Sequence, residues 1–211
     1  MFKVNVMKYL IDFFLLLIAF PIFLIIFPII SLLIVIFDSR PVLYSQKRVG
    51  LNGIEFKLLK FRTMSVSSDQ SIHEEHYKYL SENKKIEPSL TPDNPIRIEN
   101  DDRITKIGSF LRKTSLDELP NLINVAQGKM SFVGPRPLVK YESDLYGIYS
   151  NKRNSVKPGI TGLAQIQGRL DLSLQERLFW DLKYVENKSA IYDLVIILKT
   201  FVSVISRRGA N

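Results

Sequence analysis

The sequence predicts an α+β fold, mainly α, with a kinked re-entrant membrane helix at the N-terminus, a short β-hairpin, and a helical domain carrying interfacial amphipathic helices. Three observations support this prediction: a long apolar run, two short extended stretches around a glycine turn, and helical spacing of apolar residues from residue 104 onward. The 211 residues suffice for one ordinary domain and a small appendage. We expect residues 1–38 to form the membrane helix and residues 39–211 the domain, with an acidic insert at about 65–100.

The apolar run extends from Phe13 to Phe37, which is 25 residues without a charged side chain. A membrane helix needs about 20 such residues, so the run is long enough to cross a bilayer. It is too long for a secretory signal peptide, and no small-residue cleavage site follows it. Pro21 and Pro28 each remove a backbone donor and clash with the preceding turn, which predicts a kink.

Both flanks of the run are basic. The flanking cations are Lys3 and Lys8 before it, and Arg40, Lys47 and Arg48 after it. A helix that spans the membrane carries its basic excess on one side only. We therefore expect a helix that enters and leaves through the cytoplasmic face, with a plain single-pass anchor as the alternative.

Charge and composition narrow the class of partner. The net charge of the chain is +8. Two basic segments, residues 39–64 with a net charge of +5 and residues 103–211 with a net charge of +8, flank an acidic segment at residues 65–102 with a net charge of −5. Basic surface suits anionic lipid, nucleotides or nucleic acid, and the membrane run favours lipid. Basic platforms rich in aromatic residues are absent, so no nucleic acid is expected. The chain has no cysteine, which excludes disulfides, thiolate metal sites and cysteine nucleophiles.

Two extended stretches follow the run, Val42–Gln46 and Ile54–Leu58, and the turn residues Gly50–Gly53 between them predict a β-hairpin. This hairpin would display cations near the membrane, namely Arg48, Lys57, Lys60 and Arg62. Residues 65–100 are polar and acidic, and we expect a helix around Ser71–Ser81 and then an irregular linker.

Helical patterning resumes after this segment. Four apolar residues fit one helix face: Ile104, Ile107, Phe110 and Leu111. A second helix is expected from Ser115 to Gly128, a turn at Lys157–Gly162, and a third helix from Ser173 to about Glu186. Ile191–Ile205 predicts a strongly apolar helix that fits either the core or the membrane interface.

Two adjacent acids, Asp117 and Glu118, are the first candidates for chemistry. Ser115 and Glu118 have the spacing of a capping box, and acids in a first helical turn need no further role. A helix N-terminus is also a phosphate site, because it presents free amide donors. An ionised aspartate there can attack phosphorus, and both carboxylates can reach one Mg²⁺. Arg112 and Lys113, one turn upstream, can neutralise phosphate oxygens.

The segment Gly134-Pro135-Arg136-Pro137 is the second candidate. Two prolines fix φ on both sides of the arginine and make a stiff presenter for its guanidinium. Such a loop is either a rigid turn with a solvated arginine or an arginine fork aimed at a nucleotide phosphate or base.

Five motifs in this order resemble the bacterial sugar transferases, the monotopic polyprenyl-phosphate phosphoglycosyl transferases. They are Lys8…Asp12, Lys60-Phe61-Arg62-Thr63-Met64, Arg112 through Pro120, Gly134 through Pro137, and Lys157 through Gln165. The resemblance covers nearly the whole chain outside residues 65–100. An ordered set of five is far more specific than any one motif, and it overturns the interpretation of the acid pair as a helix cap alone.

The resemblance implies a membrane enzyme that starts glycan assembly on a lipid carrier. Asp117 would attack the sugar-bearing phosphate of a UDP-sugar, expel UMP and hold the phosphosugar covalently. Polyprenyl (undecaprenyl) phosphate would then accept it, giving a polyprenyl-diphosphate sugar, the first membrane step of polysaccharide synthesis. Glu118 would assist through Mg²⁺ or proton handling, so both acids are the expected metal ligands.

The resemblance also assigns the remaining residues and the location. Phosphate and nucleotide contacts are expected from Lys60, Arg62, Arg112, Pro135, Arg136 and Pro137. Membrane anchoring is expected from Lys8, Asp12, Pro21 and Pro28. The enzyme would lie in the bacterial inner membrane with its catalytic domain on the cytoplasmic face. Its partners would be the UDP-sugar, polyprenyl phosphate and membrane lipids, and its interface-type helices are compatible with a homodimer.

Two positions depart from the family pattern, since no Ser-Pro pair follows Asp12 and Tyr9 stands where a second base is common. The insert at 65–100 matches no segment of the family.

A competing hypothesis is a non-catalytic, membrane-anchored adaptor whose basic surface binds anionic lipid. It explains the apolar run and the charge but not the ordered motifs. A transferase that moves sugar without phosphate is a further rival, and it would release UDP rather than UMP.

Overall fold

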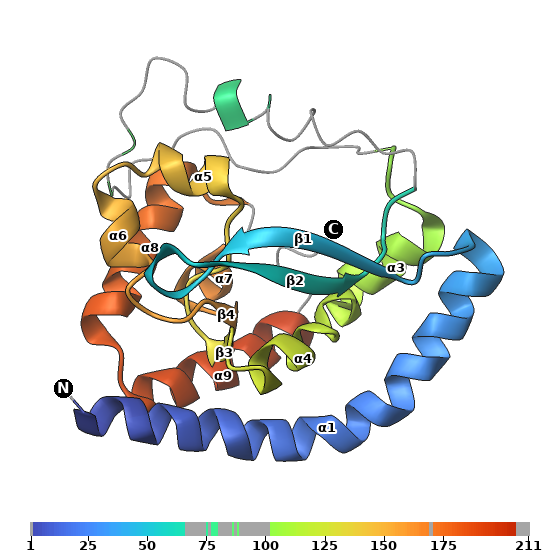
Figure 1. Ribbon diagram of the computed structural model, residues 1–211, viewed down its shortest axis with the longest axis horizontal. Coiled ribbons are helices and arrows are strands. Elements are labelled where there is room, and N and C mark those ends of the chain that lie inside the picture. Colours follow the sequence, from blue (N-terminus) through green and yellow to red (C-terminus); the bar gives the residue numbers. More distant parts are fainter. Residues whose placement is uncertain are drawn as a thin grey trace.

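The computed structural model of the protein describes residues 2–65, 75, 77–79, 86, 88, 102–168 and 171–205. These residues form a mainly helical α+β structure with one long apolar helix and two small two-stranded sheets (Figure 1). The long helix α1 lies beneath the domain and then bends upward along one side of it. The predicted fold class is confirmed at this level.

Helix α1 extends without interruption over Phe2–Asp38 and contains both predicted proline positions, Pro21 and Pro28. Figure 1 shows the helix bent, which is expected because each proline removes a hydrogen bond to the preceding turn. The segment Val6–Asp38 has the length and hydropathy of a membrane helix, and only 11% of its most apolar window is buried. Most apolar side chains of this window therefore face outward rather than into a protein core.

Both ends of α1 pack on the same domain. Near the N-terminus, the carboxylate of Asp12 accepts hydrogen bonds from the Ser131 hydroxyl at 2.9 Å and from the Phe132 amide at 3.0 Å. At the other end, Asp38 Oδ2 accepts a bond of 2.6 Å from the Thr105 hydroxyl. A buried cluster also joins this end to the hairpin and to α3; it comprises Ile30, Ile34, Phe61 and Leu111.

The predicted hairpin is confirmed, with longer strands than the sequence indicates. Strands β1 (Leu43–Val49) and β2 (Glu55–Phe61) pair antiparallel, with Lys47 opposite Lys57. The 3₁₀ turn η1 (Leu51–Gly53) connects them, and Gly53 has a φ of 80°, a conformation that favours glycine.

Helix α3 (Lys106–Thr114) begins two residues after Ile104, which was predicted on its apolar face and instead forms a β-bridge with Met64. The Thr105 hydroxyl caps the helix by accepting a hydrogen bond from the Gly108 amide. Leu111 is buried as expected, but Phe110 is 56% exposed, so the predicted apolar face is only partly internal. Gly108 lies against the backbone of Thr63, since a Cβ atom there would be 2.0 Å from the Thr63 carbonyl oxygen.

The single helix predicted from Ser115 to Gly128 is wrong. Ser115 adopts a left-handed conformation, the 3₁₀ turn η2 covers Leu116–Glu118, and helix α4 covers only Asn121–Ala126. Pro120 precedes α4 and cannot donate the main-chain hydrogen bond that a continuous helix requires. The acid pair therefore lies in a short turn between two helices.

A second sheet was not expected. Strands β3 (Ser131–Val133) and β4 (Gly159–Thr161) pair in parallel, so the predicted turn at Lys157–Gly162 contains a strand. Helices α5 (Lys140–Leu145) and α6 (Tyr149–Arg153) lie between these strands in the chain, and neither is evident from the sequence pattern.

The C-terminal helices agree with prediction. After the short helix α7 (Leu163–Gln167), helix α8 covers Leu174–Asn187 and helix α9 covers Ala190–Ile205. Helix α9 runs alongside the first half of α1 (Figure 1). It buries Ile196 completely and exposes four apolar side chains by more than half: Ile191, Leu198, Phe201 and Val202. It thus contributes both to the core and to an apolar outer face.

The helix predicted at Ser71–Ser81 lies largely outside the described residues. Two described residues of this acidic segment are nevertheless in the core, because Tyr77 and Ile86 pack with Leu138, Tyr146 and Leu178. The segment is therefore attached to the domain at these points.

Candidate active site

The structure brings the two predicted acids together with a lysine from the hairpin. Lys60 Nζ donates to Glu118 Oε1 at 2.6 Å and to Asp117 Oδ2 at 3.2 Å. Lys60 comes from β2, whereas the acids come from η2, so packing of the hairpin against this turn creates the contact. Asp117 is buried, with 8% of its surface exposed. The pair is thus a partly enclosed anionic site with one cation between its members.

Arg136 completes this cluster. Its Nη1 donates to Glu118 Oε1 at 2.8 Å, so the same carboxylate oxygen receives both Lys60 and Arg136. Burial alone would raise the pKa of Glu118, but attraction by the two cations outweighs it and holds that pKa far below its usual range. Glu118 is therefore ionised at neutral pH. The carboxylate in turn raises the pKa of Arg136.

The capping box predicted for Ser115 and Glu118 does not form. Ser115 makes no side-chain cap, and the Glu118 carboxylate bonds Lys60 and Arg136 instead of the Ser115 amide. A genuine capping box occurs at the start of α8, where Ser173 and Glu176 bond reciprocally. The acid pair is thus not explained by helix capping.

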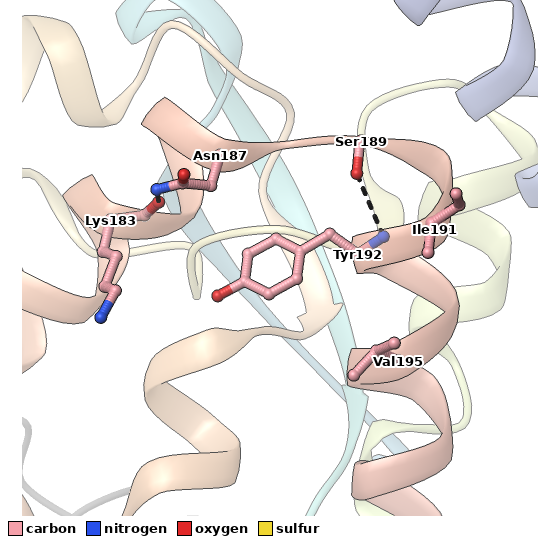
Figure 2. A pocket seen from close by; sticks show the side chains of 6 residues that line it. All are labelled: Lys183, Asn187, Ser189, Ile191, Tyr192 and Val195. Atoms are coloured by element: carbon pink, nitrogen blue, oxygen red, sulfur yellow. Dashed lines mark hydrogen bonds between the residues drawn. The ribbon is translucent and has the colours of Figure 1, made fainter.

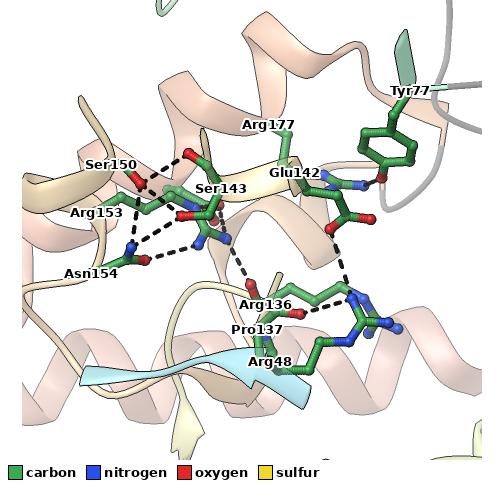
Figure 3. Close-up of polar contacts among 11 residues, drawn as sticks. Arg48, Tyr77, Arg136, Pro137, Glu142, Ser143, Ser150, Arg153, Asn154 and Arg177 are labelled. Atoms are coloured by element: carbon green, nitrogen blue, oxygen red, sulfur yellow. Dashed lines mark hydrogen bonds and ion pairs between the residues drawn. The ribbon is translucent and has the colours of Figure 1, made fainter. Parts of the chain in front are cut away.

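The loop that carries Arg136 is held by two arginines that the sequence analysis did not single out for this role (Figure 3). Arg153 donates to the Arg136 carbonyl oxygen at 2.7 Å, and Arg48 donates to the Pro137 carbonyl oxygen at 3.4 Å. Arg153 pairs with Asp181, and Arg48 lies 3.7 Å from Glu142. Arg48 and Arg153 lie in polar stretches that carry no local signal of such a contact.

The other predicted phosphate ligands lie at different places. Arg62 is buried and donates to the main-chain carbonyls of Asp38, Ser39 and Arg40, so it caps the C-terminus of α1. Arg112 Nε donates to the Thr63 hydroxyl at 3.0 Å, at the crossing of α3 and the chain after β2. The Arg62 guanidinium thus bonds the chain at the end of α1, and these hydrogen bonds do not reach the acid pair.

The predicted anchoring residues of α1 contact the domain. Lys8 Nζ donates to Asp193 at 2.7 Å, to the Val133 carbonyl at 2.8 Å and to Tyr184 at 3.1 Å. Asp12 binds β3 as described above, whereas Pro21 and Pro28 lie in the bent middle of the helix. Lys8 and Asp12 therefore fasten the first half of α1 to β3, α8 and α9.

A separate pocket lies between the end of α8 and the start of α9 (Figure 2). Its lining residues are Lys183, Asn187, Ser189, Ile191, Tyr192 and Val195. None of the residues predicted for phosphate, nucleotide or metal binding lines it. It is therefore not the site of the acid pair.

The acid pair fits Mg²⁺ by its donor chemistry. In the part of the chain that the structure describes, Asp117 Oδ1 and Glu118 Oε2 accept no hydrogen bond. The two side chains keep 12% and 18% of their surface exposed, so this end of the pair is open to solvent. Mg²⁺ commonly binds through one or two carboxylates together with substrate phosphates and water. The described residues contain no group of three or more potential ligands, so a bound ion would need such outside oxygens.

Comparison with known proteins identifies the family. The sequence profile described as "Bacterial sugar transferase" matches residues 3–207, and the chain belongs to this family. The matched span extends across residues 65–100.

Individual relatives are about 40% identical to the chain over the aligned residues. It is 42% identical over 175 residues to the exopolysaccharide production protein ExoY of Sinorhizobium fredii, covering 82% of this chain and 74% of that protein. It is 40% identical over 173 residues to the undecaprenyl-phosphate galactose phosphotransferase of Salmonella typhimurium, covering 82% and 35%. It is 38% identical over 178 residues to the UDP-glucose:undecaprenyl-phosphate glucose-1-phosphate transferase of Xanthomonas campestris pv. campestris, covering 81% and 33%. The chain thus spans about a third of the length of these two longer relatives.

Proposed function

We propose that this protein transfers a sugar 1-phosphate from a UDP-sugar to polyprenyl (undecaprenyl) phosphate, releasing UMP and starting the synthesis of a polysaccharide on the membrane. The observation that carries the proposal is the arrangement of Asp117 and Glu118 between Lys60 and Arg136 in a member of the sugar transferase family. Two cations beside two carboxylates suit a substrate that brings a diphosphate.

In the first step, the carboxylate of Asp117 attacks the phosphorus that carries the sugar. A bond forms between this phosphorus and a carboxylate oxygen, and the bond to the UMP oxygen breaks, so UMP leaves with the electron pair. Asp117 Oδ1, which accepts no hydrogen bond from the described residues, suits the role of the attacking atom. The product is an aspartyl-phosphosugar.

In the second step, a phosphate oxygen of the polyprenyl phosphate attacks the same phosphorus and releases the Asp117 carboxylate. Lys60 and Arg136 stabilise the negative charge on the transferred group in both steps, because they are fixed before the substrate arrives. Glu118 holds both cations in place. Its strongly lowered pKa favours this role, and the binding of Mg²⁺, over proton donation. When bound, Mg²⁺ would neutralise charge on the diphosphate.

Helix α1 would place this chemistry at the membrane. We propose that it is re-entrant, so that both of its ends and residues 39–211 lie on the cytoplasmic face of the bacterial inner membrane. Lys8 and Asp12 at one end and Asp38 at the other contact the same domain, which supports this topology. A domain on one side of the bilayer cannot bind both ends of a helix that spans it.

The test is the intact mass of the detergent-solubilised protein after incubation with Mg²⁺ and UDP-sugars, without lipid acceptor. Galactose and glucose occur in the names of the relatives, so UDP-galactose and UDP-glucose come first in the panel. A phosphosugar adduct that is absent from Asp117→Asn would support the covalent mechanism and name the donor.

Other outcomes would point to the rival functions. UMP release only with acceptor, and never an adduct, would favour direct transfer. UDP release would indicate transfer of the sugar without phosphate. No release of either nucleotide with any donor and acceptor would favour the membrane-anchored adaptor, for which Asp117→Asn is harmless.

A further inference from the structure

We propose that Arg153 and Asp181 form a positioning pair for the loop Gly134–Pro137, which fixes the main chain of Arg136 so that its guanidinium reaches Glu118. The inference rests on the proposed function, because it assigns these two residues a part in the same reaction. Neither residue contacts the acid pair directly, so neither is itself catalytic.

The contacts form an unbroken chain from α8 to the acid pair. Arg153 Nε on α6 donates to Asp181 Oδ2 on α8 at 2.8 Å, and Arg153 Nη2 lies 2.8 Å from the same oxygen in an ion pair. Arg153 Nη2 also donates to the main-chain oxygen of Arg136 at 2.7 Å, and Figure 3 shows the arginine extended toward this loop. The side chain of Arg136 then reaches Glu118 at 2.8 Å.

The two prolines of the loop leave the φ angle of Arg136 variable, and the hydrogen bond from Arg153 restricts it. Pro135 and Pro137 have fixed φ angles, and Pro137 biases Arg136 toward extended conformations, but neither ring fixes the φ of Arg136 at one value. Rotation about that bond would swing both the carbonyl and the side chain of Arg136. A hydrogen bond to the carbonyl therefore also sets the direction in which the guanidinium points.

Burial of the pair indicates a role beyond stability. The side chains of Arg153 and Asp181 are 2% and 1% exposed. A buried ion pair is expensive to desolvate, and apolar residues of similar volume often stabilise a fold as well or better. Arg153 uses two nitrogens of one planar guanidinium for different partners, Nε for the Asp181 carboxylate and Nη2 for the Arg136 carbonyl. A lysine ammonium, with its donors on a single nitrogen, does not reproduce this geometry.

The test compares rates of UMP release by the full chain in detergent with UDP-sugar and undecaprenyl phosphate. Arg153→Lys keeps the charge beside Asp181 but loses the fork, and we expect kcat/KM for the donor to fall about tenfold. In the background of Arg136→Met the same change should cost less than about twofold, because the group that it positions is already gone.

Two further variants distinguish a loss of Arg136 positioning from a general loss of folded structure. Lys152→Met is the matched control: Lys152 is the neighbour of Arg153 on α6 and pairs with Glu186 on α8, but this pair lies at the surface. It should leave kcat/KM unchanged. Asp181→Asn keeps the side-chain shape and should repeat the pattern of Arg153→Lys, and thermal melting of each variant establishes that it is folded.

An equal loss of kcat/KM in both backgrounds, or full activity in folded Arg153→Lys and Asp181→Asn, would overturn the inference. Absence of UMP release from the unmodified protein would instead contradict the proposed function, and the pair would then have no reaction to support. The two failures are therefore distinguishable in one set of measurements.

Discussion

The ammonium of Lys60 lies 2.6 Å from Oε1 of Glu118, although 58 positions separate the two residues in the chain. This contact joins the hairpin to the turn η2 and leaves the same carboxylate oxygen shared with Arg136. The site is thus assembled from three elements that are distant in sequence. Its electrostatics depend on the packing of the hairpin as much as on the acids themselves.

Removal of the Lys60 ammonium should therefore strongly reduce activity. We expect Lys60→Met to lower the rate of UMP release on the order of 100-fold, because it deletes a fixed cation from the partly buried site that, in the proposed reaction, stabilises phosphate charge. Lys57→Met is the control, since Lys57 lies on the same strand with an exposed side chain. Steady-state rates of both variants check the prediction, and equal rates would contradict it.

The pH dependence of folding stability should reveal the lowered pKa of Glu118. Its pKa in the folded protein lies below the usual value of 4.5, so its contribution to stability is complete above about pH 4.5. As the pH falls further, the unfolded chain takes up a proton that the folded chain does not, and stability declines. Glu118→Gln has no such proton to bind, so its unfolding free energy should fall less steeply with acidification. Urea unfolding from pH 6 down to the lowest pH at which the protein folds measures the two slopes; parallel slopes would count against the assignment.

The crossing of α3 and the chain after β2 should tolerate no side chain at Gly108. A Cβ atom there would lie 2.0 Å from the Thr63 carbonyl oxygen, and this contact is with backbone. We expect Gly108→Ala to destabilise the fold by about 1–3 kcal/mol, because the two segments must separate. Gly53→Asn is the comparison: nothing lies within 4 Å of that position, and asparagine tolerates its positive φ. Melting temperatures of both variants test this difference.

The sequence predicts the elements of this protein better than their contacts. The hairpin is predictable because extended residues flank turn residues, and α8 because a serine and a glutamate three positions later cap it. The same capping signal fails at Ser115, where Lys60 and Arg136 take the Glu118 carboxylate instead. A local pattern does not include competing partners that come from elsewhere in the chain.

Contacts between distant parts of the chain are also what the sequence does not predict at the site. The types of residue at the acid pair and at Arg136 follow from motifs, whereas the hydrogen bonds that hold the Arg136 loop do not. Strands β3 and β4 have three residues each and are separated by 25 residues, so they are too short for a periodic signal. Arg62 matches a motif for phosphate, yet its donors bind carbonyl oxygens at the end of α1 and just after it.

The topology of α1 gives a prediction that separates a re-entrant helix from a spanning one. The chain has no cysteine, so single cysteines can be introduced at both ends by Met7→Cys and Arg40→Cys, whose native side chains are exposed. If both ends lie on the cytoplasmic face, a membrane-impermeant maleimide should label neither variant in intact cells and both in inverted membrane vesicles.

The two prolines should be required for this result, because a straight helix of 37 residues would measure about 55 Å and would carry one end away from the domain. We expect replacement of both Pro21 and Pro28 by alanine to expose Met7→Cys to the reagent in intact cells while Arg40→Cys stays protected. Labelling of only one end in the unmodified helix would show that α1 spans the membrane and that the contacts of Lys8 and Asp12 with the domain do not form there.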